Sequence, residues 1–316
     1  MLEDIARRLM AVVDEERMRR DLFYLSRDPL PFRTLNYRLP GHVLSTLEEA
    51  DAYIAGELAL AGYDVEREAV RVQALRRDFA KPPSAQYAPP LPTDPWYTAH
   101  NLYAYRRGTA LPNEYIVVLA HKDSQSWIPS PGANDNCAGT VGVLEVARAL
   151  ATYQPRRTLV CLFCNEEHTP WTSITAAERL VNEGRTLVAA LNVDSIGAKS
   201  DADRAAGRMA NVTRYATAEG ERLADLFAAL NARYGIGLEQ SKYETERPGD
   251  DDGSFIQAGL PAAVMNIGSL PYADPAYHRE EDRPERVDLP NAVLTLRLIL
   301  AVVAHLDAAC GPGRGA

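Results

Sequence analysis

Residues 115–123 read Tyr-Ile-Val-Val-Leu-Ala-His-Lys-Asp, a short β-branched run that ends in a histidine and an aspartate. Similar apolar runs recur at residues 158–164, 187–193 and 262–267. The helices predicted around these runs span residues 138–153, 173–182, 218–234 and 289–309. Short apolar strands that alternate with helices indicate a parallel sheet covered on both faces. The sequence therefore predicts an α/β fold, a three-layer α/β/α sandwich with a central, mostly parallel mixed sheet.

The chain is long enough for a substantial core. With 316 residues and 46% hydrophobic side chains, it can bury one large core or two small ones. Residues 1–40 read as a helical segment that ends in a Pro/Arg-rich turn. Six prolines in residues 81–95 exclude a helix or an inner strand and predict a long surface loop. A strand predicted at residues 101–105 would pair with the segment before this loop, so residues 1–316 are expected to form a single domain.

Charge excludes some partners. The net charge is −9 and the pI is near 5.3, whereas nucleic acids and anionic membrane surfaces require a basic patch. The apolar runs read as short strands and not as membrane spans. The N-terminus begins as a charged amphipathic helix without the apolar segment of a signal peptide. A cytoplasmic protein with no nucleic-acid or membrane partner is expected, and its oligomeric state is not predicted.

The cysteines are not expected to bind metal. There are too few of them for a disulfide scaffold in a chain of this length. They are Cys137, Cys161, Cys164 and Cys310. Cys161 and Cys164 have the spacing of a CxxC motif, but they lie inside the predicted strand at residues 158–164. Residues three apart on a strand point to opposite faces, so both thiols are predicted to be buried core side chains.

Potential metal ligands stand where the predicted strands end. His121 and Asp123 share a face of an extended segment, so the carboxylate can hydrogen-bond one imidazole nitrogen while the other nitrogen binds a metal. A lone histidine at a strand end is also a common structural residue. Asp135 precedes the predicted helix after a glycine-containing turn, where helix capping and metal binding both suit a carboxylate.

Two adjacent acids, Glu166 and Glu167, directly follow a buried strand. Their charges are costly there unless a cation compensates them, although a solvated turn is the alternative. One of them can bind a metal, while its neighbour, with a raised pKa, accepts a proton from the attacking water. Asp194 ends the strand at 187–193, and His278 lies well downstream. Two histidines and three acidic ligands suit a pair of zinc ions that share one bridging carboxylate.

These motifs, in this order, resemble the co-catalytic zinc aminopeptidases of peptidase family M28 over residues 45–309. The matching segments are Ala-His121-Lys-Asp123-Ser, Gly-Ala-Asn-Asp135-Asn-Cys-Ala-Gly, Asn-Glu166-Glu167, Asn-Val-Asp194-Ser-Ile-Gly, Asp251-Asp252-Gly-Ser-Phe255 and Tyr277-His278. Several motifs in the right order are more specific than any one of them. The resemblance implies a zinc-dependent exopeptidase fold.

The resemblance also implies roles. The zinc ligands would be His121 and Asp194 for one ion, Glu167 and His278 for the other, and Asp135 as the bridge. Glu166 would be the general base, Asp123 would orient His121, and Tyr277 would stabilise the tetrahedral oxyanion. The implied reaction is hydrolysis of the N-terminal bond of a short peptide or small amide.

One loop departs from the family. After the glutamate pair the chain has His168-Thr-Pro-Trp171, where many members have a Gly-Leu-Gly-Ser-type turn. That loop borders the substrate pocket in relatives, so His168 and Trp171 are candidate pocket residues, although each could simply pack against the rim. The other candidates, from the acidic segment, are Asp251, Asp252 and Phe255.

Other activities remain open. Glutaminyl-peptide cyclotransferases have the same fold with a single zinc, and they resemble this chain at Asp194-Ser-Ile-Gly-Ala198 and in the Trp after the glutamate pair. They usually carry Trp before the last ligand histidine, so Tyr277 favours the peptidase. A carboxypeptidase or another small-amide hydrolase is also conceivable, but no arginine for a substrate carboxylate can be identified. A receptor role is disfavoured because no ligand is missing.

Overall fold

The apolar runs form the centre of the sheet. In the computed structural model, which describes residues 2–309, four strands lie side by side in the order β11, β8, β5, β6 and pair in parallel. Their bounds are Ala263–Ile267, Thr186–Val193, Leu111–His121 and Arg157–Cys164. Their carboxyl ends meet at one edge of the sheet, where an α/β protein exposes functional side chains.

Antiparallel strands extend this centre on both sides, so the sheet is mixed. Within the described residues it has nine strands, in the order β10-β9-β11-β8-β5-β6-β4-β1-β7. The outer strands are β1 (Val65–Ala74), β4 (Trp96–Arg106), β7 (His168–Thr169), β9 (Ala210–Tyr215) and β10 (Glu239–Glu244). β4, β1 and β7 pair antiparallel on one side, and β9 pairs antiparallel with β11 on the other. The predicted parallel arrangement therefore holds for the central strands.

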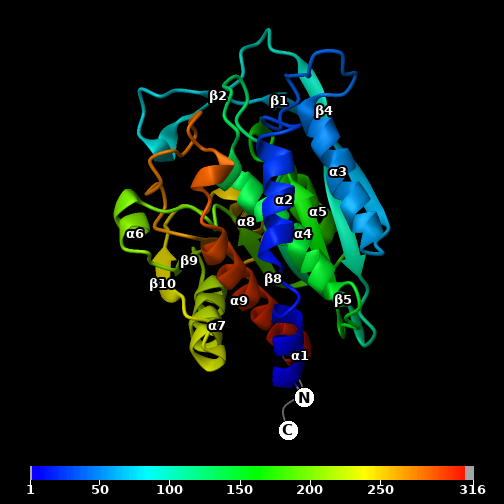
Figure 1. Ribbon diagram of the computed structural model, residues 1–316. Helices are drawn as coiled ribbons and strands as arrows, with labels where there is room; N and C mark the ends of the chain where they lie inside the picture. Colours follow the sequence, from blue (N-terminus) through cyan, green and yellow to red (C-terminus); the bar gives the residue numbers. More distant parts are fainter. Residues whose placement is uncertain (1, 310–316) are drawn as a thin grey trace.

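Helices cover both faces of the sheet (Figure 1). The larger core lies under α1 (Leu2–Met10), α2 (Glu15–Ser26), α3 (Thr46–Leu60), α4 (Gly139–Leu150), α7 (Ala218–Tyr234) and α9 (Leu289–Ala308). The smaller core lies under α5 (Thr172–Asn182) and α8 (Asp250–Gln257). A short helix, α6, spans Asp201–Ala205. This is the three-layer sandwich that the sequence predicts.

Helix α9 corrects the expectation that every apolar run is short. Its 20 residues are long and apolar enough to cross a membrane by length and composition alone, with a mean hydropathy of 1.8. However, 72% of that stretch is buried inside the protein. α9 packs against α1 and α7 and contributes much of the larger core. A helix that is apolar on nearly all sides is typical of a buried core helix.

The CxxC thiols lie on opposite faces of β6, as predicted. Cys161 packs in the larger core and Cys164 in the smaller one, where its Sγ lies 3.0 Å from Asp251 Oδ2. Cys310 lies outside the described residues.

We expect the double change of Cys161 and Cys164 to alanine to leave the zinc content unchanged. It should lower the free energy of unfolding by about 1 to 3 kcal/mol, because core packing and the hydrogen bond from Cys164 Sγ to Asp251 are lost. Metal analysis and denaturant unfolding of the same preparation check this. Loss of one zinc ion per chain would contradict the assignment to the core.

The proline-rich segment is more ordered than a plain surface loop. β2 (Arg76–Arg77) pairs antiparallel with β3 (Tyr87–Ala88), and a short 3-10 turn at Pro83–Ala85 lies between them. We call residues 76–88 the ribbon. Most side chains of residues 81–95 are exposed, as predicted, but Gln86 is buried and contacts His278. The ribbon therefore reaches the part of the molecule that contains the candidate ligands.

Candidate metal centre

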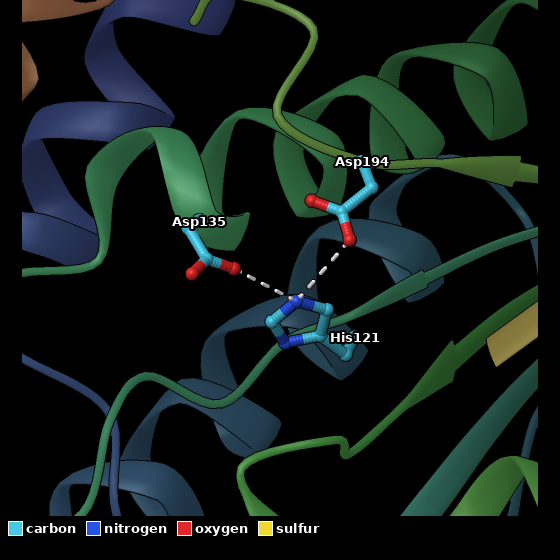
Figure 2. Close-up of side chains that lie close together, drawn as sticks. All are labelled: His121, Asp135 and Asp194. Carbon is cyan, nitrogen blue, oxygen red and sulfur yellow. Dashed lines mark ion pairs between the residues drawn. The ribbon is translucent and has the colours of Figure 1, made fainter. Parts of the chain in front are cut away.

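Three of the predicted ligands meet at the carboxyl ends of the central strands. His121 is the last residue of β5, Asp194 directly follows β8, and Asp135 lies in the turn before α4. His121 Nε2 is 3.2 Å from Asp135 Oδ1 and 3.6 Å from Asp194 Oδ2 (Figure 2). All three side chains are buried, and Figure 2 shows both carboxylates directed at the same imidazole nitrogen. This group could hold a metal ion, and we call it the first metal position.

The second group shares one residue with the first. His278 Nε2 is 3.3 Å from Asp135 Oδ2 and 3.7 Å from Glu167 Oε1. In each group the potential ligand atoms lie within 4.8 Å of one another. Asp135 directs Oδ1 to the first group and Oδ2 to the second, which is the geometry of a bridging carboxylate. The group of Asp135, Glu167 and His278 could hold a second ion, and we call it the second metal position.

The donor atoms fit zinc. Imidazole nitrogens and carboxylate oxygens are common zinc ligands in catalytic sites. His278 Nε2 is buried without a hydrogen-bond partner, and such an atom is costly unless something satisfies it. Burial lowers the pKa of His278 to about 3, which keeps the imidazole in the neutral form that binds metal. Around His121, burial opposes protonation, yet hydrogen bonds to Asp123, Asp135 and Asp194 raise its pKa well above the usual value, so this cluster favours a cation.

Asp123 organises the site around His121. Its Oδ1 lies 3.3 Å from His121 Nδ1, which leaves Nε2 directed at the first metal position. The same carboxylate accepts hydrogen bonds from the backbone N–H groups of Glu166 (2.9 Å) and Glu167 (2.8 Å). It also lies 2.7 Å from Nδ1 of His168, which is fully buried. Asp123 thus fixes the glutamate pair as well as the histidine.

The sequence leaves helix capping and metal binding open at Asp135. The side chain that accepts a hydrogen bond from Gly139 N, at the start of α4, is that of its neighbour Asn136, through Oδ1 at 2.8 Å. The Asp135 carboxylate is left to the metal positions. Asp282 accepts hydrogen bonds from the backbone N–H groups of Asn134 (2.8 Å) and Asp135 (3.0 Å) and so fixes this turn. Asp282 carries no role in the sequence prediction, although it follows His278 by only four residues.

The profile of Peptidase family M28 matches residues 101–310. The chain belongs to peptidase family M28. This M28 chain is 28% identical over 199 residues to a protein named probable zinc metalloprotease from Pyrenophora teres f. teres, a match that covers 52% of the chain and 41% of the fungal protein. The chain therefore matches less than half of that relative's length.

Solved structures share the fold. An aminopeptidase from Aneurinibacillus sp. strain AM-1 superposes with a TM-score of 0.70 at 17% identity, covering 94% of this chain and 95% of that one. A glutaminyl cyclase from Bacteroides thetaiotaomicron superposes with a TM-score of 0.68 at 16% identity, covering 93% and 98%. At these identities the likeness shows the fold alone, and the predicted fold class is confirmed.

In the M28 site Glu166 lies beside both metal positions without belonging to either group. Its side chain lines a pocket together with Asp135, Asp194 and Tyr277. Burial raises the pKa of Glu166 well above its usual value, and the nearby charges of Asp250 and Asp251 raise it further. A carboxylate with a raised pKa is a stronger proton acceptor once it is ionised.

Tyr277 lies next to the second metal position. Its ring stacks on the His278 imidazole, with 3.7 Å between ring centroids and 23° between planes. Burial raises the pKa of Tyr277 well above its usual value, so the hydroxyl stays protonated and can donate a hydrogen bond.

The pocket is lined by residues other than the five predicted ones. Its outer wall is formed by Ala198, Arg214, Asp250, Met265, Ile267, Leu270 and Tyr272. Within the acidic segment Asp250 faces the pocket, whereas Asp251 and Asp252 are turned inward. Successive residues on a helix point in different directions, so only part of an acidic run can face one cavity.

The predicted pocket residues contact other parts of the protein. Asp251 accepts from Cys164 Sγ, Asp252 accepts from Arg214 Nη2 at 2.9 Å, and Phe255 packs in the smaller core. His168 lies on Asp123, as described above. Trp171 lies at the rim, 6.1 Å from the ring centroid of Tyr87. Asp251, Asp252, Phe255 and His168 are not among the residues that line the pocket, and Trp171 contacts the pocket residue Tyr87. Their roles in substrate binding stay predictions.

Four residues beside the metal positions carry no role in the sequence prediction. They are Arg77, Gln86, Tyr87 and Gln125. The Tyr87 hydroxyl donates to Glu166 Oε1 at 3.3 Å and to Glu167 Oε1 at 3.2 Å. Gln125 Nε2 donates to Asp135 Oδ2 at 3.0 Å and to Glu167 Oε1 at 2.8 Å. Gln125 shares the polar turn of Asp123, which was a usable signal, whereas nothing in the ribbon sequence marks its three residues.

Proposed function

We propose that this chain is a zinc metallopeptidase that binds two zinc ions and removes the N-terminal residue from short peptides or related small amides. The observation that carries the proposal is the shared carboxylate: Asp135 offers one oxygen to each of two buried groups, with Glu166 beside both. This donor set suits two ions and a separate proton acceptor.

The first ion would be held by His121 and Asp194, the second by Glu167 and His278, and both by Asp135. When bound, zinc polarises the scissile carbonyl and lowers the pKa of the attacking water. Glu166 takes a proton from that water and passes it to the leaving amine. Tyr277 donates a hydrogen bond to the oxygen that becomes negative as the carbonyl is attacked.

The enclosure of the site supports cleavage at a chain end. Asp135 is 5% exposed, Asp194 4% and Glu166 2%, so the groups proposed to react are buried side chains of the pocket lining. A buried site accommodates one terminal residue more readily than a continuous peptide chain. The Glu166 carboxylate in the pocket lining favours an end that carries a positive amine, whereas the Asp250 carboxylate pairs with Arg214.

A titration tests this function. Protein stripped of metal by a chelator is titrated with zinc while the turnover of a panel of amino-acyl amides is followed. The proposal expects no activity without metal and a maximum at no more than two zinc ions per chain. Full activity in the stripped protein would rule out the proposal.

A cyclotransferase is the second candidate. The glutaminyl cyclase named above has the same fold, and Trp171 stands at the rim of the pocket. Against it, the residue before His278 is Tyr277, whereas such cyclases usually carry Trp there.

Tyr277→Phe separates a transition-state role from a packing role. Because the hydroxyl would contact the oxygen only as charge develops, we expect kcat to fall by roughly 10- to 10³-fold with little change in KM. The phenylalanine ring keeps the stacking on His278, so zinc content should not change. Steady-state kinetics on a peptide substrate check this, and a wild-type kcat in the variant would remove Tyr277 from the mechanism.

A further inference from the structure

The ribbon places a cation at the second metal position. The Arg77 guanidinium forms an ion pair with Glu167 Oε2, and the Arg77 side chain is only 1% exposed. Its central carbon lies 4.0 Å from the centroid of the Tyr87 ring, so the cation is held between an aromatic face and a ligand carboxylate. Arg77 Nε is buried without a hydrogen-bond partner.

The two metal positions therefore have different surroundings. Within residues 2–309, no lysine or arginine forms an ion pair with His121, Asp135 or Asp194. At the second position, by contrast, Arg77 pairs with Glu167. Gln125 also donates to the oxygens of Asp135 and Glu167 that face His278. No lysine or arginine of the described residues therefore competes with a zinc ion for the ligands of the first position through an ion pair. At the second position, the Arg77 guanidinium and the Gln125 amide both compete with the ion for carboxylate oxygens.

We propose that Arg77 makes the two metal positions unequal by weakening zinc binding at Asp135, Glu167 and His278, so that the first position fills first. Two positive charges repel each other strongly in a buried site of low dielectric constant. The guanidinium also draws electron density from Glu167 and occupies Oε2, which leaves only Oε1 for the metal. This inference rests on the proposed two-zinc function and adds an order of loading to it.

The ribbon that carries Arg77 lies outside the segment that matches the M28 profile. The residues that match the M28 profile begin at 101, whereas the ribbon spans residues 76–88. The ribbon also supplies Gln86, whose Oε1 lies 3.2 Å from His278 Nδ1 and directs Nε2 toward the second position. The same segment therefore orients a ligand of the second position and places a cation against another.

Calorimetric zinc titration of metal-free protein against a competing chelator tests the order of loading. The variants are Arg77→Met, which keeps the length and removes the charge, and Arg77→Lys, which keeps the charge. The matched control is Arg76→Met on the same strand, since Arg76 pairs with the Asp94 carboxylate at 2.7 Å and has no contact with the ligands. Native mass spectrometry counts the bound ions in each sample.

In the wild type we expect two zinc ions with unequal Kd values. In Arg77→Met the weaker Kd should tighten by about 10- to 100-fold, the range over which groups behind the ligands alter metal affinity. The tighter Kd should change much less, because Arg77 pairs with Glu167, which belongs to the second group alone. Arg77→Lys and Arg76→Met should both stay close to the wild type.

Two results would overturn the inference in distinguishable ways. If the wild type binds two ions and Arg77→Met leaves the weaker Kd unchanged or weakens it, Arg77 does not limit the second position, and the two-zinc function stands. If neither protein binds more than one ion at any zinc concentration, the two-zinc function fails together with the inference.

Discussion

Replacing Glu166 with glutamine is expected to lower turnover by roughly 10²- to 10⁴-fold while the zinc content stays at the wild-type level. Glutamine has nearly the same shape, but its amide cannot accept the proton that the attacking water must lose. Glu166 belongs to neither ligand group, and the Asp123 carboxylate holds its backbone N–H, so the turn should survive the change. Turnover of an amino-acyl amide gives the loss of activity, and metal analysis of the same sample gives the zinc content.

The neighbouring residue provides the matched control. Glu167→Gln removes a ligand of the second position, so zinc and activity should fall together in that variant. If Glu166→Gln also lost zinc in proportion to its activity, Glu166 would be a ligand and its role as general base would be wrong.

Asp135→Asn should have the largest effect on metal content of any single ligand change. One carboxylate serves both positions, so an amide there weakens both ions at once. Loss of the metal removes several kcal/mol of charge stabilisation, which corresponds to roughly 10³-fold or more in rate. The backbone of this turn is held by Asp282, so the fold should persist. Zinc titration and thermal unfolding of the variant measure both expectations.

Asp194→Asn is the comparison for the bridge. Asp194 belongs to the first group alone, so this variant should retain zinc at the second position. Two zinc ions bound to Asp135→Asn with wild-type affinity would show that Asp135 is not the bridge.

The central strands could be predicted because their sequence pattern is local. β5, β6, β8 and β11 are apolar runs of the length of a strand, buried on both faces, and the sequence alone identifies them. β9 and β10 were not predicted. Almost every residue of β10 is exposed, and β9 carries Asn211, Thr213 and Arg214 among its apolar residues. β10 is an edge strand, whereas β9 lies between β10 and β11. A strand with many polar residues depends on pairing with its neighbours and leaves little signal in the sequence.

The candidate ligands could also be predicted from a local pattern, because they follow the apolar runs of the central strands. His121, Glu167 and Asp194 follow apolar runs, and the ends of parallel strands meet in space, so their proximity could be expected. The ribbon residues Arg77 and Tyr87 reach the same place through tertiary folding of a proline-rich segment, which no local pattern indicates. Sequence order places three acids at the start of α8 without giving their direction, so it could not show that Asp250 is the one that lines the pocket.

The most direct test of the account is the identity of the products formed by the zinc-loaded wild-type chain. Peptides that begin with leucine, alanine or glutamine are incubated with the protein. The products are separated, and their masses are measured by mass spectrometry. The account predicts a free N-terminal amino acid and a peptide shortened by one residue, with gain of one water, and no product when zinc is removed. Release of ammonia from the glutaminyl peptide, with a cyclised N-terminus and no cleavage of any peptide in the panel, would contradict it.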